Sequence, residues 1–178
     1  MRYLLFLPLA ISLLLTGCIG TPKGITPVGH FDLQKYLGRW YEIARLDHSF
    51  ERGLTRVTAT YSLRPDGGIK VVNRGYSPEQ NRWKQAIGKA YFVKSPKLGY
   101  LKVSFFGPFY AAYVVFDIDK PHYHYALVTG PDKSYLWILS RRPTISKTLL
   151  DKLIAKANAA GFDTHKLVLV KQNGPQKE

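Results

Sequence analysis

Apolar and polar residues alternate along most of the chain at the period of a half-buried β-strand. Short runs rich in Val, Tyr and Phe are separated by turn-forming clusters such as Pro65-Asp66-Gly67 and Gly130-Pro131-Asp132. Strands at this spacing predict an all-β sandwich or barrel. The expected strands cover residues 39–46, 54–64, 68–76, 82–92, 99–106, 111–119, 123–129 and 134–141.

The period changes near the C-terminus, where one amphipathic helix is predicted. Ser146 is a suitable N-cap, and Gly161 is a suitable residue to end the helix. A last short strand is expected at residues 167–170, and we expect the helix and this strand to pack outside the barrel. The apolar positions at helical spacing are Leu149, Leu150, Leu153, Ile154 and Ala157.

The N-terminus predicts export and a lipid anchor. The apolar run from Tyr3 to Leu15 follows a basic Arg2 and is shorter than the ~20 residues of a membrane span, so residues 1–17 are interpreted as a signal peptide. Leu15-Thr16-Gly17-Cys18 resembles the bacterial lipobox, which implies that Cys18 is the lipid attachment site. Residues 18–30 are then the lipidated N-terminus and a flexible tether. The expected location is the outer membrane of a Gram-negative bacterium, facing the periplasm.

Charge and cysteine content narrow the function classes. The sequence holds 26 Lys and Arg against 12 Asp and Glu, a net charge of +14, but no dense basic run. A solvated basic surface and attraction to anionic lipid headgroups both explain this charge. Nucleic acid is not expected as a partner, because the chain is exported and carries no nucleic-acid motif. Since the single cysteine is used by the anchor, no thiol is left for a disulfide, a metal or catalysis.

Three short motifs then point to a family. Gly38-Arg39-Trp40-Tyr41 resembles the Gly-x-Trp signature of lipocalins, Asp119 with Tyr123 resembles the second motif, and Arg141 resembles the third. Residues 31–178 are therefore identified as a lipocalin domain. The resemblance implies an eight-stranded antiparallel up-and-down barrel with one C-terminal α-helix and a final short strand. It also implies that Gly38, Trp40 and Arg141 are structural, with the Arg side chain lying over the Trp at the barrel floor. Three longer stretches resemble a bacterial outer-membrane branch of the family, at residues 36–45, 103–109 and 135–141.

An eight-stranded barrel leaves room for one small ligand. Because side chains alternate between the two faces of a strand, the sequence predicts which of them face inward and line this space. The strand at 111–119 is apolar on both faces, so the sequence does not decide which of its faces points into the barrel. Asn73 is the polar exception on an apolar face, and it needs a neighbour, a water or a ligand headgroup as its partner. The expected ligand-binding residues are Ala59, Tyr61, Val71, Asn73, Val103, Phe105 and Trp137.

The resemblance implies a protein that stores or transports a fatty acid or lysophospholipid in envelope maintenance, with no cofactor and no metal. The alternatives are a carrier of haem or a sterol-like molecule and a lipid-modifying enzyme. Catalysis is not expected, because neighbours such as Asp47-His48-Ser49 rarely converge into a triad. His122 and His124 share a strand face but lie beside a turn, so exposed histidines are expected there. The sequence leaves open whether the protein forms a homodimer across the barrel mouth.

Overall fold

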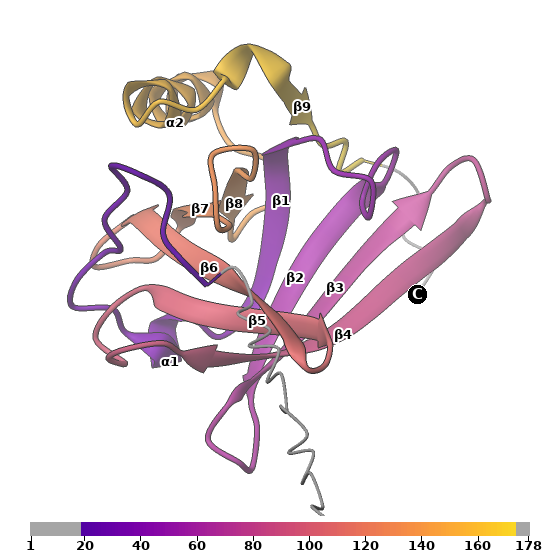
Figure 1. Cartoon of the computed structure of the whole chain (residues 1–178). Coiled ribbons are helices and arrows are strands. Elements are labelled where there is room, and N and C mark those ends of the chain that lie inside the picture. Colours follow the sequence, from indigo (N-terminus) through magenta and orange to yellow (C-terminus); the bar gives the residue numbers. More distant parts are fainter. Residues whose placement is uncertain (1–18, 174–178) are drawn as a thin grey trace, which may run out of the picture.

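A computed structural model describes residues 19–173, so the predicted signal peptide and Cys18 lie outside the described residues. Within that range, eight consecutive antiparallel strands close into a barrel, because β1 pairs with both β2 and β8 (Figure 1). The predicted up-and-down barrel is confirmed. The strands are β1 (Gly38–Leu46), β2 (Thr55–Leu63), β3 (Ile69–Ser77), β4 (Arg82–Phe92), β5 (Tyr100–Phe106), β6 (Phe109–Ile118), β7 (Tyr125–Thr129) and β8 (Trp137–Ser140).

The strand boundaries differ most from prediction in β6, β7 and β8. β6 starts two residues earlier than expected and pairs Phe109 with Phe106 across a tight hairpin. β7 starts later, because Tyr123 has a left-handed backbone with φ of 60°. β8 is shorter, because Tyr135 still donates its backbone N–H to Asp132 within a turn.

A short helix that the sequence analysis did not predict precedes the barrel. This helix, α1 (Leu33–Tyr36), is capped by the Asp32 carboxylate, which accepts hydrogen bonds from the backbone of Gln34 at 3.0 Å and Lys35 at 3.4 Å. It marks the closed end of the barrel. Because the topology is up-and-down, the loops at residues 47–54, 78–81, 107–108 and 130–136 lie at the other end, which we call the open end.

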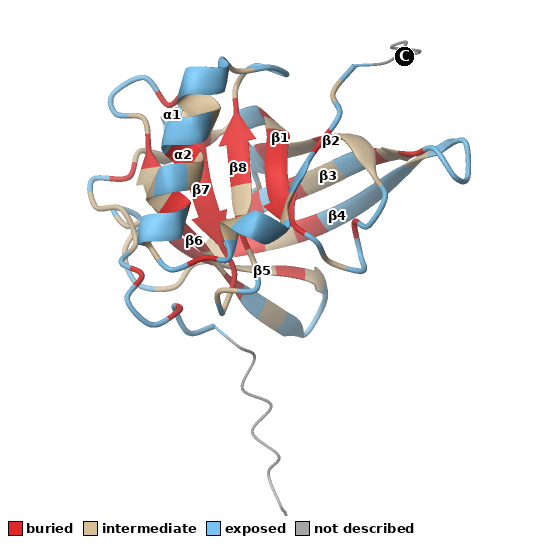
Figure 2. Ribbon diagram, turned by 90° about the horizontal axis from the view of Figure 1, so that it is seen from above, coloured by how far each residue is buried: buried red, intermediate tan, exposed pale blue. Residues whose placement is uncertain are grey.

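The C-terminal elements brace the outside of the barrel, as predicted. Helix α2 (Lys147–Ala159) buries Leu153 and Ala157, and Figure 2 shows it lying over β7 and β8. A 3-10 turn, η1 (Thr164–Lys166), leads into β9 (Leu167–Leu169), which pairs with the end of β1. No helix within residues 19–173 is long and apolar enough to cross a membrane.

The segment before α1 corrects the expectation of a free tether. The Val28 N–H donates to the Val115 carbonyl at 2.9 Å, and the Val28 carbonyl accepts from Gly99 at 2.9 Å. Ile25 is 7% exposed and packs into an outer apolar cluster with Tyr100. Because these residues bury apolar surface and satisfy backbone groups of the barrel, the segment lies along its wall instead of extending into solvent.

Candidate functional site

The closed end of the barrel is sealed by a cation–π pair between two of the motif residues. Trp40 is fully buried, and the Arg141 guanidinium carbon lies 3.9 Å from its ring centroid. The same guanidinium donates hydrogen bonds to the carbonyls of Arg39 at 2.8 Å, Leu37 at 2.9 Å and Lys35 at 2.5 Å. A cation–π contact such as that between Arg141 and Trp40 stabilises the folded state by ~0.5–2 kcal/mol. The arrangement makes the barrel floor rigid, which is a structural role.

Gly38 is required here by the backbone. Its φ of 92° lies in the left-handed region that favours glycine. A Cβ at this position would stand 3.5 Å from Nη1 of Arg141. A contact at that distance is ordinary, so the glycine of the first motif is favoured by its backbone conformation at the turn into β1 and not by a lack of space.

The seven residues predicted to line the barrel lie on its inner face. Six of them belong to the interior apolar cluster that also contains Trp40. Asn73 is directly opposite Ala59 in the β2–β3 register, so the two side chains share the inner face. The six cluster members are Ala59, Tyr61, Val71, Val103, Phe105 and Trp137.

The structure also determines the parity of β6. Tyr113 and Val115 join the interior cluster, and the β6–β7 register then shifts between Val115 and Asp117. Ile118 is therefore interior as well, although it would face outward in a regular strand. One extra residue in a bulge reverses the alternation of inner and outer side chains. Both faces of the segment are apolar because the outward-facing Ala112 and Val114 are also buried, in the outer cluster that contains Ile25.

Three tyrosine hydroxyls meet inside the barrel. The Tyr113 hydroxyl is hydrogen-bonded to those of Tyr36 at 2.6 Å and Tyr61 at 2.7 Å. Burial raises the pKa of Tyr61 to about 12 and the pKa values of the other two well above their ordinary value, so all three stay neutral. The two hydrogen bonds among the three hydroxyls use two of their three O–H donors. The third O–H is therefore available to a ligand oxygen or a water. Only Tyr61 was predicted, because the parity of Tyr113 was undecided and Tyr36 precedes the first strand.

Asn73 presents a second polar point to the interior. Its Oδ1 atom is buried and has no hydrogen-bond partner among the described residues. A buried acceptor without a partner costs ~1–3 kcal/mol. A ligand that carries a hydroxyl or ammonium donor would remove that cost, which is why Asn73 is a candidate contact for a lipid headgroup.

A cluster of charged side chains lies toward the open end of the barrel, beneath the loop at residues 47–54. Arg45 is 1% exposed, and its Nη1 donates to Glu42 at 2.6 Å. Its Nη2 donates to the Glu51 carbonyl at 2.8 Å, and the Glu51 carboxylate accepts from Trp137 Nε1 at 3.0 Å. These contacts fix the β1–β2 loop over the barrel mouth, with Glu51 reaching down to the inner face.

Sequence reasoning missed this cluster because the side chains of Glu42 and Arg45, three residues apart, would point to opposite faces of a regular strand. The β1–β8 register shifts between Glu42 and Ala44, and the shift turns Arg45 to the same side as Glu42. The signal in the sequence is a pair of opposite charges in the second half of β1, where the other residues are apolar.

Burial sets the protonation of the two glutamates. Desolvation and the neighbouring Glu42 charge raise the pKa of Glu51 to about 8, although Arg45 lowers it. Desolvation also raises the pKa of Glu42, against the attraction of Arg45. At neutral pH Glu51 is therefore mostly protonated, and the interior of the barrel mouth carries little net charge.

His48 ties two open-end loops together. Its ring stacks on Tyr135 at 4.0 Å, and its Nε2 lies 2.9 Å from the Ser134 carbonyl. Asp47 instead pairs with Arg52 at 2.6 Å. Asp47 and His48 are thus engaged with other groups, which gives no support to a catalytic triad at Asp47-His48-Ser49.

The two histidines that share a strand face lie at the β6–β7 turn. His122 and His124 are exposed and stack on each other at 5.3 Å, and His124 Nδ1 lies 3.0 Å from Asp119. Among residues 19–173, no group of three or more His, Cys, Asp or Glu side chains is placed to hold a metal ion.

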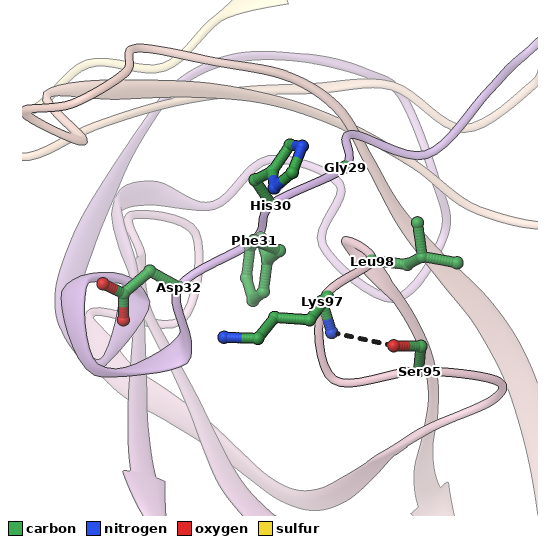
Figure 3. A pocket seen from close by; sticks show the side chains of 7 residues that line it. All are labelled: Gly29, His30, Phe31, Asp32, Ser95, Lys97 and Leu98. Atoms are coloured by element: carbon green, nitrogen blue, oxygen red, sulfur yellow. Dashed lines mark hydrogen bonds between the residues drawn. The ribbon is translucent and has the colours of Figure 1, made fainter.

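A surface hollow of about 670 Å³ lies outside the predicted ligand site (Figure 3). It opens near the closed end, between the segment before α1 and the β4–β5 loop. Its lining is mixed, with charged Asp32 and Lys97 beside the buried Phe31. We therefore place the candidate ligand site inside the barrel, where the apolar lining and the buried polar points converge.

Comparison with known proteins agrees with this fold. The family model described as a lipocalin-like domain matches residues 31–172. The outer membrane lipoprotein Blc of Vibrio cholerae is 59% identical over 161 residues, which cover 90% of this chain and 94% of that protein. The protein of the same name from Escherichia coli K12 is 56% identical over 153 residues, 86% of each chain. Among solved structures, insecticyanin from Manduca sexta aligns with a TM-score of 0.68 at 22% identity over 88% of each chain.

Proposed function

The chain belongs to the lipocalin family, and on that premise we propose that it is an outer-membrane lipoprotein that carries one fatty acid or lysophospholipid in its barrel. The observation that carries this proposal is the interior itself, in which apolar side chains surround two buried polar points. The polar points are the tyrosine hydroxyls around Tyr113 and the unpartnered Oδ1 of Asn73. Such a lining suits a ligand that is mostly hydrocarbon with a small polar part.

The energetics support an acyl chain as the occupant. Burial of about 16 carbons contributes roughly 12 kcal/mol at ~0.8 kcal/mol for each methylene. Association and ordering costs remove much of this gain, and micromolar or tighter binding remains within reach. The buried charges of Glu42 and Arg45 satisfy each other, so they do not oppose the entry of an apolar tail.

Anchoring to the outer membrane is part of the same proposal. The relatives from Vibrio cholerae and Escherichia coli are named outer membrane lipoproteins. In this chain the lipobox that ends at Cys18 supplies the attachment point, and two or more acyl chains on it would hold the protein stably on a bilayer. Storage or transport of lipids for envelope maintenance is consistent with that location.

The alternatives receive less support. The described residues on the inner face that were named above include no histidine, which is the commonest protein ligand for a haem iron. An enzyme would need a nucleophile and a base in contact, and His48 is engaged with Tyr135 and Ser134. A binding protein is therefore the function that the geometry supports best.

A chain-length series tests the proposal. The mature chain carrying Cys18→Ser is titrated with fatty acids from about 8 to about 16 carbons while Trp fluorescence is followed, and native mass spectrometry reports the stoichiometry. Affinity should increase with each methylene until the barrel is full, with one ligand bound per chain. An affinity that does not change with chain length would show that the tail is not in the barrel.

A further inference from the structure

The two ends of the barrel differ in charge. Two Lys or Arg residues and four Asp or Glu residues lie in the open-end loops defined above. Seven Lys or Arg residues and three Asp residues lie in the segments between the elements at the closed end, which are residues 29–37, 64–68, 93–99, 119–124 and 141–146. The excess of basic residues in the loops of the barrel is therefore confined to its closed end.

The three carboxylates of these closed-end segments each have a local partner. Asp32 caps helix α1. Asp66 accepts from Arg64 at 2.8 Å, and Asp119 lies 3.0 Å from Nδ1 of His124. The exposed basic side chains of the same segments are Lys35, Lys94, Lys97, Lys120 and Arg142. Because each carboxylate is held by a neighbouring donor, these cations give the closed end a positive surface.

The surface hollow of about 670 Å³ lies within this positive surface. Figure 3 shows His30, Asp32 and Lys97 around Phe31, which is 2% exposed. The Ser95 hydroxyl accepts from the backbone N–H of Lys97 at 3.2 Å, and its own O–H can still donate. A hollow with an ammonium group and a hydroxyl donor fits the phosphate of a lipid headgroup.

The start of the described chain lies beside the same hollow. Tyr100 begins β5 directly after the β4–β5 loop, which supplies part of the lining. The Tyr100 hydroxyl donates to the carbonyl of Ile19, and Cys18 is the residue before Ile19 in the sequence. One residue spans at most ~3.6 Å. Acyl chains on Cys18 would therefore enter a bilayer close to the closed end of the barrel.

We propose that the closed end of the barrel docks on a bilayer that contains anionic phospholipid, with a headgroup phosphate in the hollow beside Lys97. The barrel mouth then points away from the bilayer, and a ligand enters and leaves on the periplasmic side. Attraction of this kind acts within about 10 Å of the surface, so it needs the anchor and the basic side chains at the same end. This inference rests on the proposed anchor at Cys18 and adds the orientation and the contact surface.

Charge reversal in the mature chain carrying Cys18→Ser tests the surface without acyl groups. Lys94→Glu/Lys97→Glu changes two exposed lysines of the β4–β5 loop. The matched control Arg82→Glu/Lys84→Glu changes the total charge equally at two exposed positions where β4 leaves the open end. Binding to vesicles of phosphatidylethanolamine and phosphatidylglycerol is measured by sedimentation, and fatty acid binding in solution checks that each variant is folded.

We expect the closed-end variant to bind vesicles at least about tenfold more weakly than the parent, and the control to stay within about twofold. Binding of the parent should weaken as the salt concentration rises. Equal losses in the two variants would show that only the total charge matters, and no loss in either would show that the basic surface is merely solvated. Either result would overturn the proposal.

Fluorescence quenching on the acylated chain tests the orientation. Gln34→Cys on α1 and Gln80→Cys on an open-end loop place a fluorescent label at exposed positions of opposite ends. With a quencher on the lipid headgroups of the same vesicles, we expect strong quenching at position 34 and little at position 80. The reverse order, or equal quenching, would overturn docking by the closed end.

Glycerol 3-phosphate distinguishes a bilayer headgroup from a free phosphate compound. We expect it to bind far more weakly than vesicles do, with its amide NMR shifts at Ser95 and Lys97. Tight binding of glycerol 3-phosphate there, with vesicle binding equal in parent and closed-end variant, would make the hollow a site for soluble phosphates and overturn the docking. If the parent binds no fatty acid in solution, the proposed function fails, which is a different result.

Discussion

Glu42 and Arg45 form a buried ion pair at 2.6 Å although they are three residues apart on one strand. The bulge between Glu42 and Ala44 brings both side chains to the inner face of the barrel. The carbonyls of Glu51 and Leu54 accept from Nη2 of Arg45 at 2.8 Å and 3.4 Å, whereas its buried Nε has no hydrogen-bond partner among the described residues. The pair thus connects the inner wall to the loop that covers the barrel mouth.

Removing one member of this pair should be strongly destabilising. Arg45→Met leaves Glu42 without its partner in a buried site, and the free energy of unfolding should fall by ~3–5 kcal/mol. The double variant Glu42→Gln/Arg45→Met should recover much of that loss, because no buried charge remains unpaired. Urea unfolding followed by circular dichroism measures both. Equal losses in the single and double variants would mean that packing, not charge, is responsible.

Glu51 should make stability depend on pH. Its pKa rises from an ordinary 4.5 to about 8 on folding, so the folded chain holds one more proton between these values. The contribution of Glu51 to the free energy of unfolding should therefore be fully present below pH 4.5 and be lost as the pH rises toward 8, with a slope of at most ~1.4 kcal/mol per pH unit. Glu51→Gln should flatten this slope in urea titrations at several pH values. A slope that persists in the variant would point to another group.

Arg141→Ala should lower thermal stability without abolishing ligand binding. The change removes the guanidinium from the Trp40 ring and deprives three carbonyls of a donor. A loss of about 1–3 kcal/mol corresponds to ~2–4 °C for each kcal/mol in a chain of this size. The exposed neighbour Arg142→Ala is the matched control and should leave the melting temperature unchanged. Lost binding at an unchanged melting temperature would contradict the structural role.

Asn73→Ala should distinguish headgroup contact from tail burial. If Oδ1 of Asn73 accepts a hydrogen bond from a headgroup, its loss should weaken lysophospholipid binding by about fivefold to tenfold. Fatty acid binding should change little, because a carboxylate has no donor to offer. Titration calorimetry with both ligands on the same variant supplies its own control. An equal effect on the two ligands would remove Asn73 from the headgroup site.

Cys18→Ser should release the protein from the membrane. Without a thiol to acylate, and with an ordinary secretory signal in place of residues 1–17, the domain should fold and appear in the soluble periplasmic fraction. Fractionation after a high-salt wash separates acyl anchoring from electrostatic attachment. Continued recovery of the variant with outer membranes would show that the anchor lies elsewhere.

The sequence by itself determined the features that depend on local pattern. Alternation of side chains predicted where the strands lie along the chain and placed Val71 and Val103 on the inner face, whereas the resemblance to lipocalins implied the barrel and its strand order. The helical spacing of Leu153 and Ala157 likewise predicted α2. These inferences succeed because the periods of strands and helices are properties of a few neighbouring residues.

Only the tertiary structure decided what happens where that pattern breaks. The bulges after Glu42 and after Val115 reverse the parity, so the charged cluster and the interior position of Ile118 could not be predicted from alternation. Tyr36 meets Tyr113 only because the chain closes into a barrel. Contacts between residues far apart depend on the register of strand pairing, and a shift of one residue moves a side chain to the other face. The lining of the barrel is for that reason a property of the folded molecule.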